Sequence, residues 1–463
     1  MKKMKFGILL IGVLATIIIG CKEESALSPS SKSNKNARIG AGNIGINVLI
    51  KGAINQTILK ELNVIGKVQK VFYEINALTM LVRSEDLSKI QSLSYVNIAN
   101  PDTEVKGAPV DAVPIADFSG GLNTWDLDAV NVTDLGVGRT EAMNGSGVYV
   151  AVLDTGLPDS WRQYFPQERI ATEYAKSFGG GGGENENVSE QPNKWEHDQN
   201  SHGGHVTSTI IGYKIGNSYI NGVAPMAKII PVKVLNQNGS GWGSVVANGI
   251  IYVANLKAGP LANSPVVINM SLGGSVLDAI ESAAIDYAIS KGVIIVASAG
   301  NSGTAGMGYP GGYAPVISVA ATGWIDQFST PDAWITGNVP DPSNADDVWI
   351  APFSSRELPG QDLDVAAPGV YTVGPYQINS GQLSYYYLSG TSMASPHVAG
   401  IVALMAQKKP NLTAAEAETI LETAAIPLGA GARNVTNFGS FSWGVDASGH
   451  GFITADAALA GTP

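Results

Sequence analysis

The sequence predicts an α/β fold, a three-layer domain with a mostly parallel central sheet, preceded by a small α+β unit. Near-continuous apolar runs, as expected of strands buried on both faces, occur at 148–153, 266–270 and 293–297. A longer apolar run at 398–405 follows a Gly-Thr-Ser turn and has the pattern of a buried helix. Residues 46–100 show shorter elements in a different order. Two parts of different construction therefore follow one another along the chain.

The N-terminus has the pattern of an export signal. Three lysines precede an apolar run at 6–20 that is too short to span a bilayer comfortably. The run ends at Cys21, the only cysteine, and Ile18-Ile19-Gly20-Cys21 resembles a bacterial lipobox. This resemblance implies cleavage before Cys21, acylation of its thiol, and attachment to the cell envelope or outer surface. A plain signal peptide with an incidental cysteine is the alternative.

The next elements form a unit of their own. The predicted order is strand, helix, two strands, helix and strand, which suggests a ferredoxin-like fold. Helices are expected at 54–62 and 85–93. A free-standing accessory domain is one interpretation of this unit. The predicted division is a signal peptide at 1–20, an acylated cysteine and flexible tether at 21–45, the small unit at 46–100, a linker at 101–122 and a large domain at 123–463.

Composition excludes some functions. A chain of 463 residues has room for a large core and more than one domain. The formal net charge of −11 argues against nucleic acid as a partner, because nucleic-acid binding requires a basic face. With Cys21 as the sole cysteine, the folded body contains neither a disulfide nor a cysteine nucleophile.

The segment 390–400 reads Gly-Thr-Ser-Met-Ala-Ser-Pro-His-Val-Ala-Gly and places Ser392 at the start of a predicted helix. Backbone N–H groups and the dipole at a helix N-terminus favour an anion. This suits a serine that attacks a carbonyl and then tolerates a negative oxygen beside it. Taken alone, Ser392 could equally be an ordinary helix cap.

A base and an orienting carboxylate can be found for this serine. His202 leads a helix-like run, whereas His205 and His397 fall inside predicted helices, where packed structural imidazoles are common. Asp154 ends the strand at 148–153, at the sheet edge where α/β proteins place their sites. Singly, Asp154 could be a turn residue.

The order Asp154, His202, Ser392, with the motif around each residue, resembles the subtilisin-like serine proteases (subtilase, peptidase S8 family). The resemblance extends from about Trp125 to Leu459. It implies that Ser392 attacks the peptide carbonyl to form an acyl-enzyme, His202 transfers the proton, and Asp154 orients the imidazole. It also implies protein or peptide substrates, and no metal or cofactor in the chemistry.

The same resemblance supplies further site residues. It makes Asn301 a side-chain donor to the developing oxyanion. It assigns substrate binding to two uncharged segments, whose members are Ser271, Leu272, Gly273, Gly274, Ala297, Ser298, Ala299 and Gly300. Glycines at a strand end leave room for an extended peptide to pair as an added strand. We therefore expect a neutral, apolar-leaning pocket.

The resemblance also implies that residues 46–100 are an inhibitory prosegment, whose tail occupies the substrate site until the enzyme cuts it. The sequence does not fix the bond that is cut. Because Cys21 lies on the prosegment side of that cut, maturation would separate the protease from its lipid anchor and release it.

The chain departs from the family pattern in two insertions, at 179–199 and 326–349. The second carries five aspartates, and the sequence leaves a structural Ca²⁺ open without assigning its ligands. A solvated acidic loop is the simpler interpretation.

Two other functional classes fit parts of the sequence. One is a surface-anchored binding module that keeps a protease fold without activity. The other is a serine esterase or lipase. The lack of a Gly-x-Ser-x-Gly elbow around Ser392 and the peptide-pairing glycines disfavour the second.

Overall fold

A computed structural model describes residues 42–115, 125–134, 138–179, 192–327, 339, 344–376 and 384–463. The predicted signal peptide, Cys21 and most of the tether lie outside the described residues. So do parts of both insertions, at 180–191 and within 328–343.

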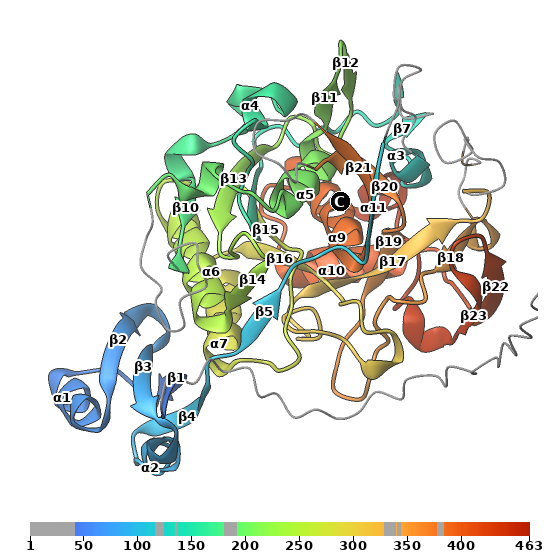
Figure 1. Cartoon of the computed structure of the whole chain (residues 1–463). Coiled ribbons are helices and arrows are strands. Elements are labelled where there is room, and N and C mark those ends of the chain that lie inside the picture. Colours follow the sequence, from blue (N-terminus) through green and yellow to red (C-terminus); the bar gives the residue numbers. More distant parts are fainter. Residues whose placement is uncertain are drawn as a thin grey trace, which may run out of the picture. The chain divides into compact units, whose positions relative to one another are not determined.

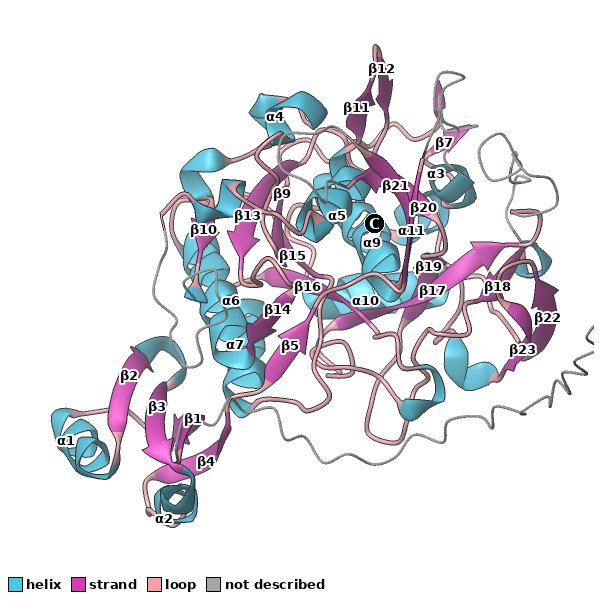
Figure 2. Cartoon of the chain, in the orientation of Figure 1, coloured by secondary structure: helices cyan, strands magenta, loops and turns pink. Residues whose placement is uncertain are grey.

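The large domain is built on an eight-stranded sheet (Figures 1 and 2). The strand order is β10-β13-β9-β15-β16-β17-β18, and β19 also pairs with β17. All pairs are parallel except β17 with β18. The strands are β9 (Tyr149–Asp154), β10 (Lys176–Ser177), β13 (Lys228–Lys233), β15 (Val266–Met270), β16 (Val293–Ser298), β17 (Ile317–Trp324), β18 (Val348–Ile350) and β19 (Val365–Pro368). The mostly parallel sheet predicted from the apolar runs is confirmed.

Helices cover both faces of this sheet (Figure 2). On β9, Val150 and Val152 belong to the core formed with α5 (His202–Ile211) and α9 (Thr391–Lys408). The alternate residues Ala151 and Leu153 belong to the core formed with α6 (Gly243–Ala258) and α7 (Ala279–Ser290). Burial on both faces explains why these strands are continuously apolar. The remaining helices of the domain are α3 (Trp125–Ala129), α4 (Trp161–Tyr164), α10 (Ala414–Ala424) and α11 (Ala455–Gly461).

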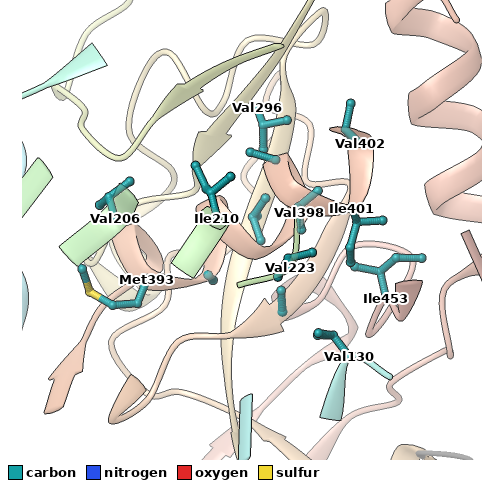
Figure 3. Packing of buried hydrophobic residues seen from close by; sticks show 14 of the residues in the cluster. Val130, Val206, Ile210, Val223, Val296, Met393, Val398, Ile401, Val402 and Ile453 are labelled. Atoms are coloured by element: carbon teal, nitrogen blue, oxygen red, sulfur yellow. The ribbon is translucent and has the colours of Figure 1, made fainter. Parts of the chain in front are cut away.

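Helix α9 runs through the middle of one core and is buried along nearly its whole length. Its side chains, including Met393 and Val398, pack among Val206 and Ile210 of α5 (Figure 3). A Cβ at Gly400 would lie 2.6 Å from Val223, so glycine permits this close approach. Packing on all sides therefore fixes the direction of α9, and with it the position of its N-terminus.

Short antiparallel pairs and a small three-stranded sheet complete the large domain. The pairs are β7 (Thr133–Asp134) with β8 (Gly138–Arg139), β11 (Tyr213–Ile215) with β12 (Ser218–Ile220), and β22 (Gly431–Val435) with β23 (Gly439–Trp443). The three-stranded sheet contains β20 (Thr372–Pro375) and β21 (Tyr385–Ser389).

The N-terminal unit follows the predicted order of elements. Its antiparallel sheet has the order β2-β3-β1-β4, with its own core of apolar side chains. The two strands predicted in the middle of this unit are separated where Asn76 adopts a left-handed conformation. The elements are β1 (Asn43–Ile50), α1 (Gln56–Ile65), β2 (Lys67–Phe72), β3 (Ala77–Arg83), α2 (Leu87–Gln91) and β4 (Val96–Pro101).

Candidate active site

Ser392 is the second residue of α9, directly after the turn at Gly390. Its side chain is buried, and its hydroxyl donates to the Ser271 carbonyl at 3.2 Å. In return, the Ser271 hydroxyl donates to the Ser392 carbonyl at 2.8 Å. The end of β15 and the start of α9 are therefore tied together at Ser392. At the second helical position the backbone N–H has no intrahelical partner and can bind an anion.

His202 begins α5, as the sequence predicts, and its ring faces Asp154 at the end of β9. Nδ1 lies 2.9 and 3.0 Å from the two oxygens of the Asp154 carboxylate, and both side chains are fully buried. Asp154 also accepts from the Thr155 backbone N–H at 2.6 Å. A carboxylate can only accept, so Nδ1 is the donor of this bond, and in the neutral imidazole Nε2 is then the acceptor. Among the described residues, Nε2 has no hydrogen-bond partner.

A buried polar network holds the turn before His202. Asp198 accepts from the Thr155 hydroxyl at 2.6 Å and from the Ser201 N–H at 2.8 Å. The Thr155 hydroxyl in turn accepts from the Gly203 N–H at 2.9 Å. Lys233 donates to the Thr155 carbonyl. Burial raises the pKa of Asp198 and lowers that of Lys233, while each charge opposes the shift of the other.

Sequence reasoning missed Asp198 and Lys233. The available signals were a lysine at the end of the apolar strand β13 and an aspartate four residues before His202.

Asn301 follows β16 and is oriented by α9. Its side-chain oxygen accepts from both the backbone N–H and the hydroxyl of Thr391, each at 2.9 Å. The Asn301 amide nitrogen therefore faces away from Thr391. It lies 3.5 Å from the point that a Cβ on Gly390 would occupy. The Asn301 donor and the N-terminus of α9 are thus neighbours.

The other two histidines in helices, His205 and His397, are buried and contact core groups. His205 Nε2 contacts the Thr372 carbonyl at 3.2 Å, and burial lowers the pKa of His205 to about 3. His397 contacts the Met393 carbonyl at 2.8 Å and Asp126 at 3.0 Å. Both rings are therefore fixed inside the core.

Both predicted substrate segments contact the N-terminus of α9, through the Ser271 hydroxyl bonded to the Ser392 carbonyl and the Gly300 N–H bonded to the Thr391 hydroxyl. Gly273 exchanges two backbone hydrogen bonds of 2.9 Å with Lys106, and Gly274 exchanges two of 2.8 Å with Tyr309. In the segment Ala297–Gly300, the Ala299 carbonyl accepts from the Gly308 N–H at 2.9 Å. The 303–312 loop therefore supports both segments.

The residues that follow the N-terminal unit, which we term the strap (104–114), pair with the large domain at two places. β5 (Glu104–Lys106) pairs with β14 (Ser240–Trp242) on one side and, through Lys106, with Gly273 on the other. β6 (Asp111–Pro114) adds to the sheet edge at β21. An extended segment of the chain itself thus occupies the position predicted for a substrate.

Comparison with known proteins gives the same family as the motifs. The sequence matches the family model described as "Subtilase family" over residues 145–460. It is 34% identical to a thermostable alkaline protease of Halalkalibacterium halodurans, over 62% of this chain and 64% of that protein. It is 32% identical to subtilisin E of Bacillus subtilis, over 79% of each chain. The chain belongs to the subtilase family.

Solved subtilase structures agree with this assignment. Fervidolysin from Fervidobacterium pennivorans, a keratinolytic enzyme related to subtilisin, superposes with a TM-score of 0.65 at 25% identity. The alignment covers 91% of this chain and 61% of that one. Sphericase gives a TM-score of 0.52 at 29% identity, over 72% of this chain and 98% of that one. This subtilase is therefore a serine-type endopeptidase that acts on protein or peptide substrates.

Carboxyl groups that could hold a cation lie away from the acidic insertion. Asp362, Asp364 and Glu418 bring one oxygen each to within 4.8 Å of one another. Burial raises the pKa of Asp364 to about 8 and that of Glu418 to about 7. In the insertion, Asp347 instead accepts hydrogen bonds from Asn344 in a local turn. Asp332 and Asp341 lie outside the described residues.

Within the described part of the chain, we find no helix with the length and apolar character needed to cross a membrane.

Proposed function

We propose that Ser392, His202 and Asp154 are the catalytic triad of this endopeptidase. The observation that carries the proposal is the convergence of their groups on one point of the strap. A Cβ placed on Gly107 would lie 3.5 Å from His202 Cε1 and 2.9 Å from the Ser271 carbonyl. That carbonyl is the group to which Ser392 donates its hydroxyl.

The chemistry follows from the geometry of these groups. Ser392 Oγ attacks the carbonyl carbon of the scissile bond while His202 Nε2 accepts its proton. The imidazolium that forms is stabilised by Asp154, which also fixes the tautomer. His202 then gives the proton to the leaving nitrogen, and the acyl group remains on Ser392. A water molecule then gives a proton to His202 and attacks the acyl carbon. Ser392 Oγ leaves, takes the proton from His202, and the acid is released.

Two donors face the oxygen that becomes negative during the attack. These are the Asn301 side-chain amide and the Ser392 backbone N–H at the start of α9. The helix N-terminus adds a favourable dipole. Removing one such donor typically costs about 10²–10³ in turnover. No metal or cofactor takes part in the proposed chemistry. The carboxyl cluster with Asp364 suits a structural Ca²⁺, because all its donors are oxygens.

Substrates would bind as the strap binds, by strand pairing. Gly273 offers both of its backbone groups to the paired chain, and residues 271–274 and 297–300 contain no charged side chain. We expect the pocket they form to accept small or apolar residues. Backbone pairing of this kind favours a peptide over a simple ester or lipid.

The N-terminal unit and the strap would act as an intramolecular inhibitor of a self-processing zymogen. In support, the strap pairs with Gly273 at the proposed substrate position. Export and acylation of Cys21 rest on the sequence motif. Removal of the inhibitor would then leave the mature protease without its lipid, free to be released.

Labelling with a biotinylated fluorophosphonate tests the proposal. After brief treatment with immobilised trypsin, which is then removed, we expect a single label on Ser392, found by peptide mass spectrometry, and hydrolysis of casein. Labelling at another residue, or ester hydrolysis without casein hydrolysis, would contradict it. The Ser395→Ala variant is the matched control, because Ser395 lies in the same helix but donates to Asn269.

A further inference from the structure

The register of the strap across the proposed active site is fixed on both sides. Before the site, the Lys106 N–H donates to the Gly273 carbonyl, and the Gly107 N–H donates to the Gly239 carbonyl, both at 2.9 Å. After the site, the Val110 N–H donates to the Ser389 carbonyl at 2.6 Å, and β6 continues along β21. Only Ala108 and Pro109 lie between these anchors.

The bond between these two residues crosses the catalytic groups. On one side, Gly107 adjoins His202 and the carbonyl that binds the Ser392 hydroxyl. On the other side, Pro109 Cα lies 3.7 Å from the point that a Cβ on Gly390 would occupy, and the Asn301 amide nitrogen lies 3.5 Å from the same point. The peptide bond presented between the proposed base and the oxyanion donor is therefore Ala108–Pro109.

Proline makes this bond a poor substrate. Cleavage would form a bond from Ser392 Oγ to the Ala108 carbonyl carbon, break the bond to the Pro109 nitrogen, and place on that nitrogen the proton held by His202. The Pro109 nitrogen carries Cδ in place of hydrogen, and the ring fixes its φ. Cδ also restricts the preceding residue. The ring therefore crowds the path along which His202 would deliver the proton.

We infer that Ala108–Pro109 is a non-cleavable bond held at the catalytic serine, so that the strap is an uncut inhibitor and the activating cut falls on a different bond. Because the strap fills its own molecule's site, that cut is made by a second copy of this enzyme, so the proposed self-processing takes place between molecules. This inference rests on the proposed roles of Ser392 and His202. It identifies Pro109 as the residue that prevents this zymogen from cutting the Ala108–Pro109 bond held at its own Ser392.

Processing of the full-length chain at several protein concentrations tests the inference. For the wild type, we expect no fragment that begins at Pro109, and a maturation rate that rises with protein concentration. For Pro109→Ala, we expect rapid cleavage after Ala108 at a rate independent of concentration, since the seated bond is then an ordinary amide. The new N-termini are identified by mass spectrometry.

Two variants serve as controls. Pro114→Ala removes a proline from the strap at its pairing with Tyr386, away from the seated bond, and should remain uncut after Ala108. Pro109→Ala combined with Ser392→Ala should stay intact. Thermal unfolding of the doubly substituted chain shows whether the change at Pro109 preserves the fold.

Two results would overturn the inference. One is a wild-type fragment beginning at Pro109 that forms at a concentration-independent rate. The other is folded Pro109→Ala that is not cut after Ala108. Fluorophosphonate labelling of the trypsin-treated wild type separates the two proposals. With Ser392 labelled, such a result refutes only the inference, whereas loss of labelling refutes the proposed function.

Discussion

Two groups of buried carboxylates in this subtilase differ in whether a basic side chain faces them. Asp154, in the proposed active site, is matched on each side by a donor: the His202 ring and the Thr155 N–H. Asp102, Asp278 and Glu281 lie where the N-terminal unit meets the starts of α6 and α7. Among the described residues, none of these three forms an ion pair, and both oxygens of Glu281 lack a hydrogen-bond partner.

The pKa values of the carboxyl groups at the interface follow from the lack of a facing basic side chain. Burial, followed by repulsion from Asp278 and Asp102, raises the pKa of Glu281 to about 8. Burial and repulsion from Asp278 raise the pKa of Asp102 to about 6. In the proposed active site, His202 faces Asp154 and Lys233 opposes the shift at Asp198, whereas no basic side chain among the described residues pairs with the carboxyl groups at the interface with the N-terminal unit. This difference would suit the proposed role of the N-terminal unit as an inhibitor that later leaves.

The largest effect is expected from a substitution that breaks the pair of Asp154 and His202, and it falls on catalysis. Asp154→Asn should lower kcat of the released enzyme by roughly 10⁴, because the amide no longer holds His202 in the tautomer that leaves Nε2 free to accept a proton. Glu281→Gln, the matched change at the other group, should leave kcat unchanged. Steady-state hydrolysis of a peptide substrate measures both. Equal losses in the two variants would show that the groups do not differ in role.

The second prediction concerns pH and the interface. The docked state holds the Glu281 proton up to about pH 8, whereas an exposed glutamate loses it near its usual value. Between these values the open state binds fewer protons, so docking weakens as pH rises, by at most about tenfold per pH unit for this group. Above about pH 8 Glu281 is ionised in both states, so a further rise in pH no longer weakens docking through this group.

Hydrogen exchange of the uncut Ser392→Ala chain measures this opening. The protection factors of the Lys106 and Gly273 amides, which report pairing of the strap, should fall between pH 5 and 8. Glu281→Gln should reduce the fall and give higher protection at pH 8. A protection factor that does not change with pH in the parent chain would refute the role assigned to this interface.

The sequence located the proposed catalytic residues better than it located the interface. Asp154, His202 and Ser392 each sit at the end of a strand or the start of a helix, and these boundaries can be predicted from apolar runs. The carboxyl group of Glu281 gave no such signal, because it is buried on α7, the helix against which the N-terminal unit packs, near Asp102. The carboxyl cluster of Asp362, Asp364 and Glu418 likewise could not be predicted from the sequence. Aspartates crowded in the 326–349 insertion suggested a site, but Asp364 and Glu418 meet only in the fold.

The register of the strap was also beyond prediction. The family resemblance predicts that the tail of the 46–100 unit occupies the substrate site, yet the bond that lies at Ser392 depends on which residue pairs with Gly273. Backbone pairing of this kind carries no side-chain code, since glycine accepts any partner in the strand. The hydrogen bonds of Lys106 in the structure supply that register.

The smallest expected effect sharpens the comparison at one side chain. The Asn47 amide nitrogen donates to Asp102 at 2.9 Å and to Asp278 at 2.8 Å, so it is the donor that the two carboxyl groups share. Asn47→Ala should increase opening of the strap roughly tenfold, since leaving a buried polar group unsatisfied costs about 1–3 kcal/mol. Asn63→Ala is the control, because the bonds of Asn63 to other described residues stay within the N-terminal unit, at Leu59 and Val68. If both variants lowered the protection factor of Lys106 equally, the effect would come from general loss of stability in that unit. A larger fall for Asn47→Ala, greatest at pH 8 where the carboxyl groups carry more charge, would place the weak point of the inhibitor at this shared donor.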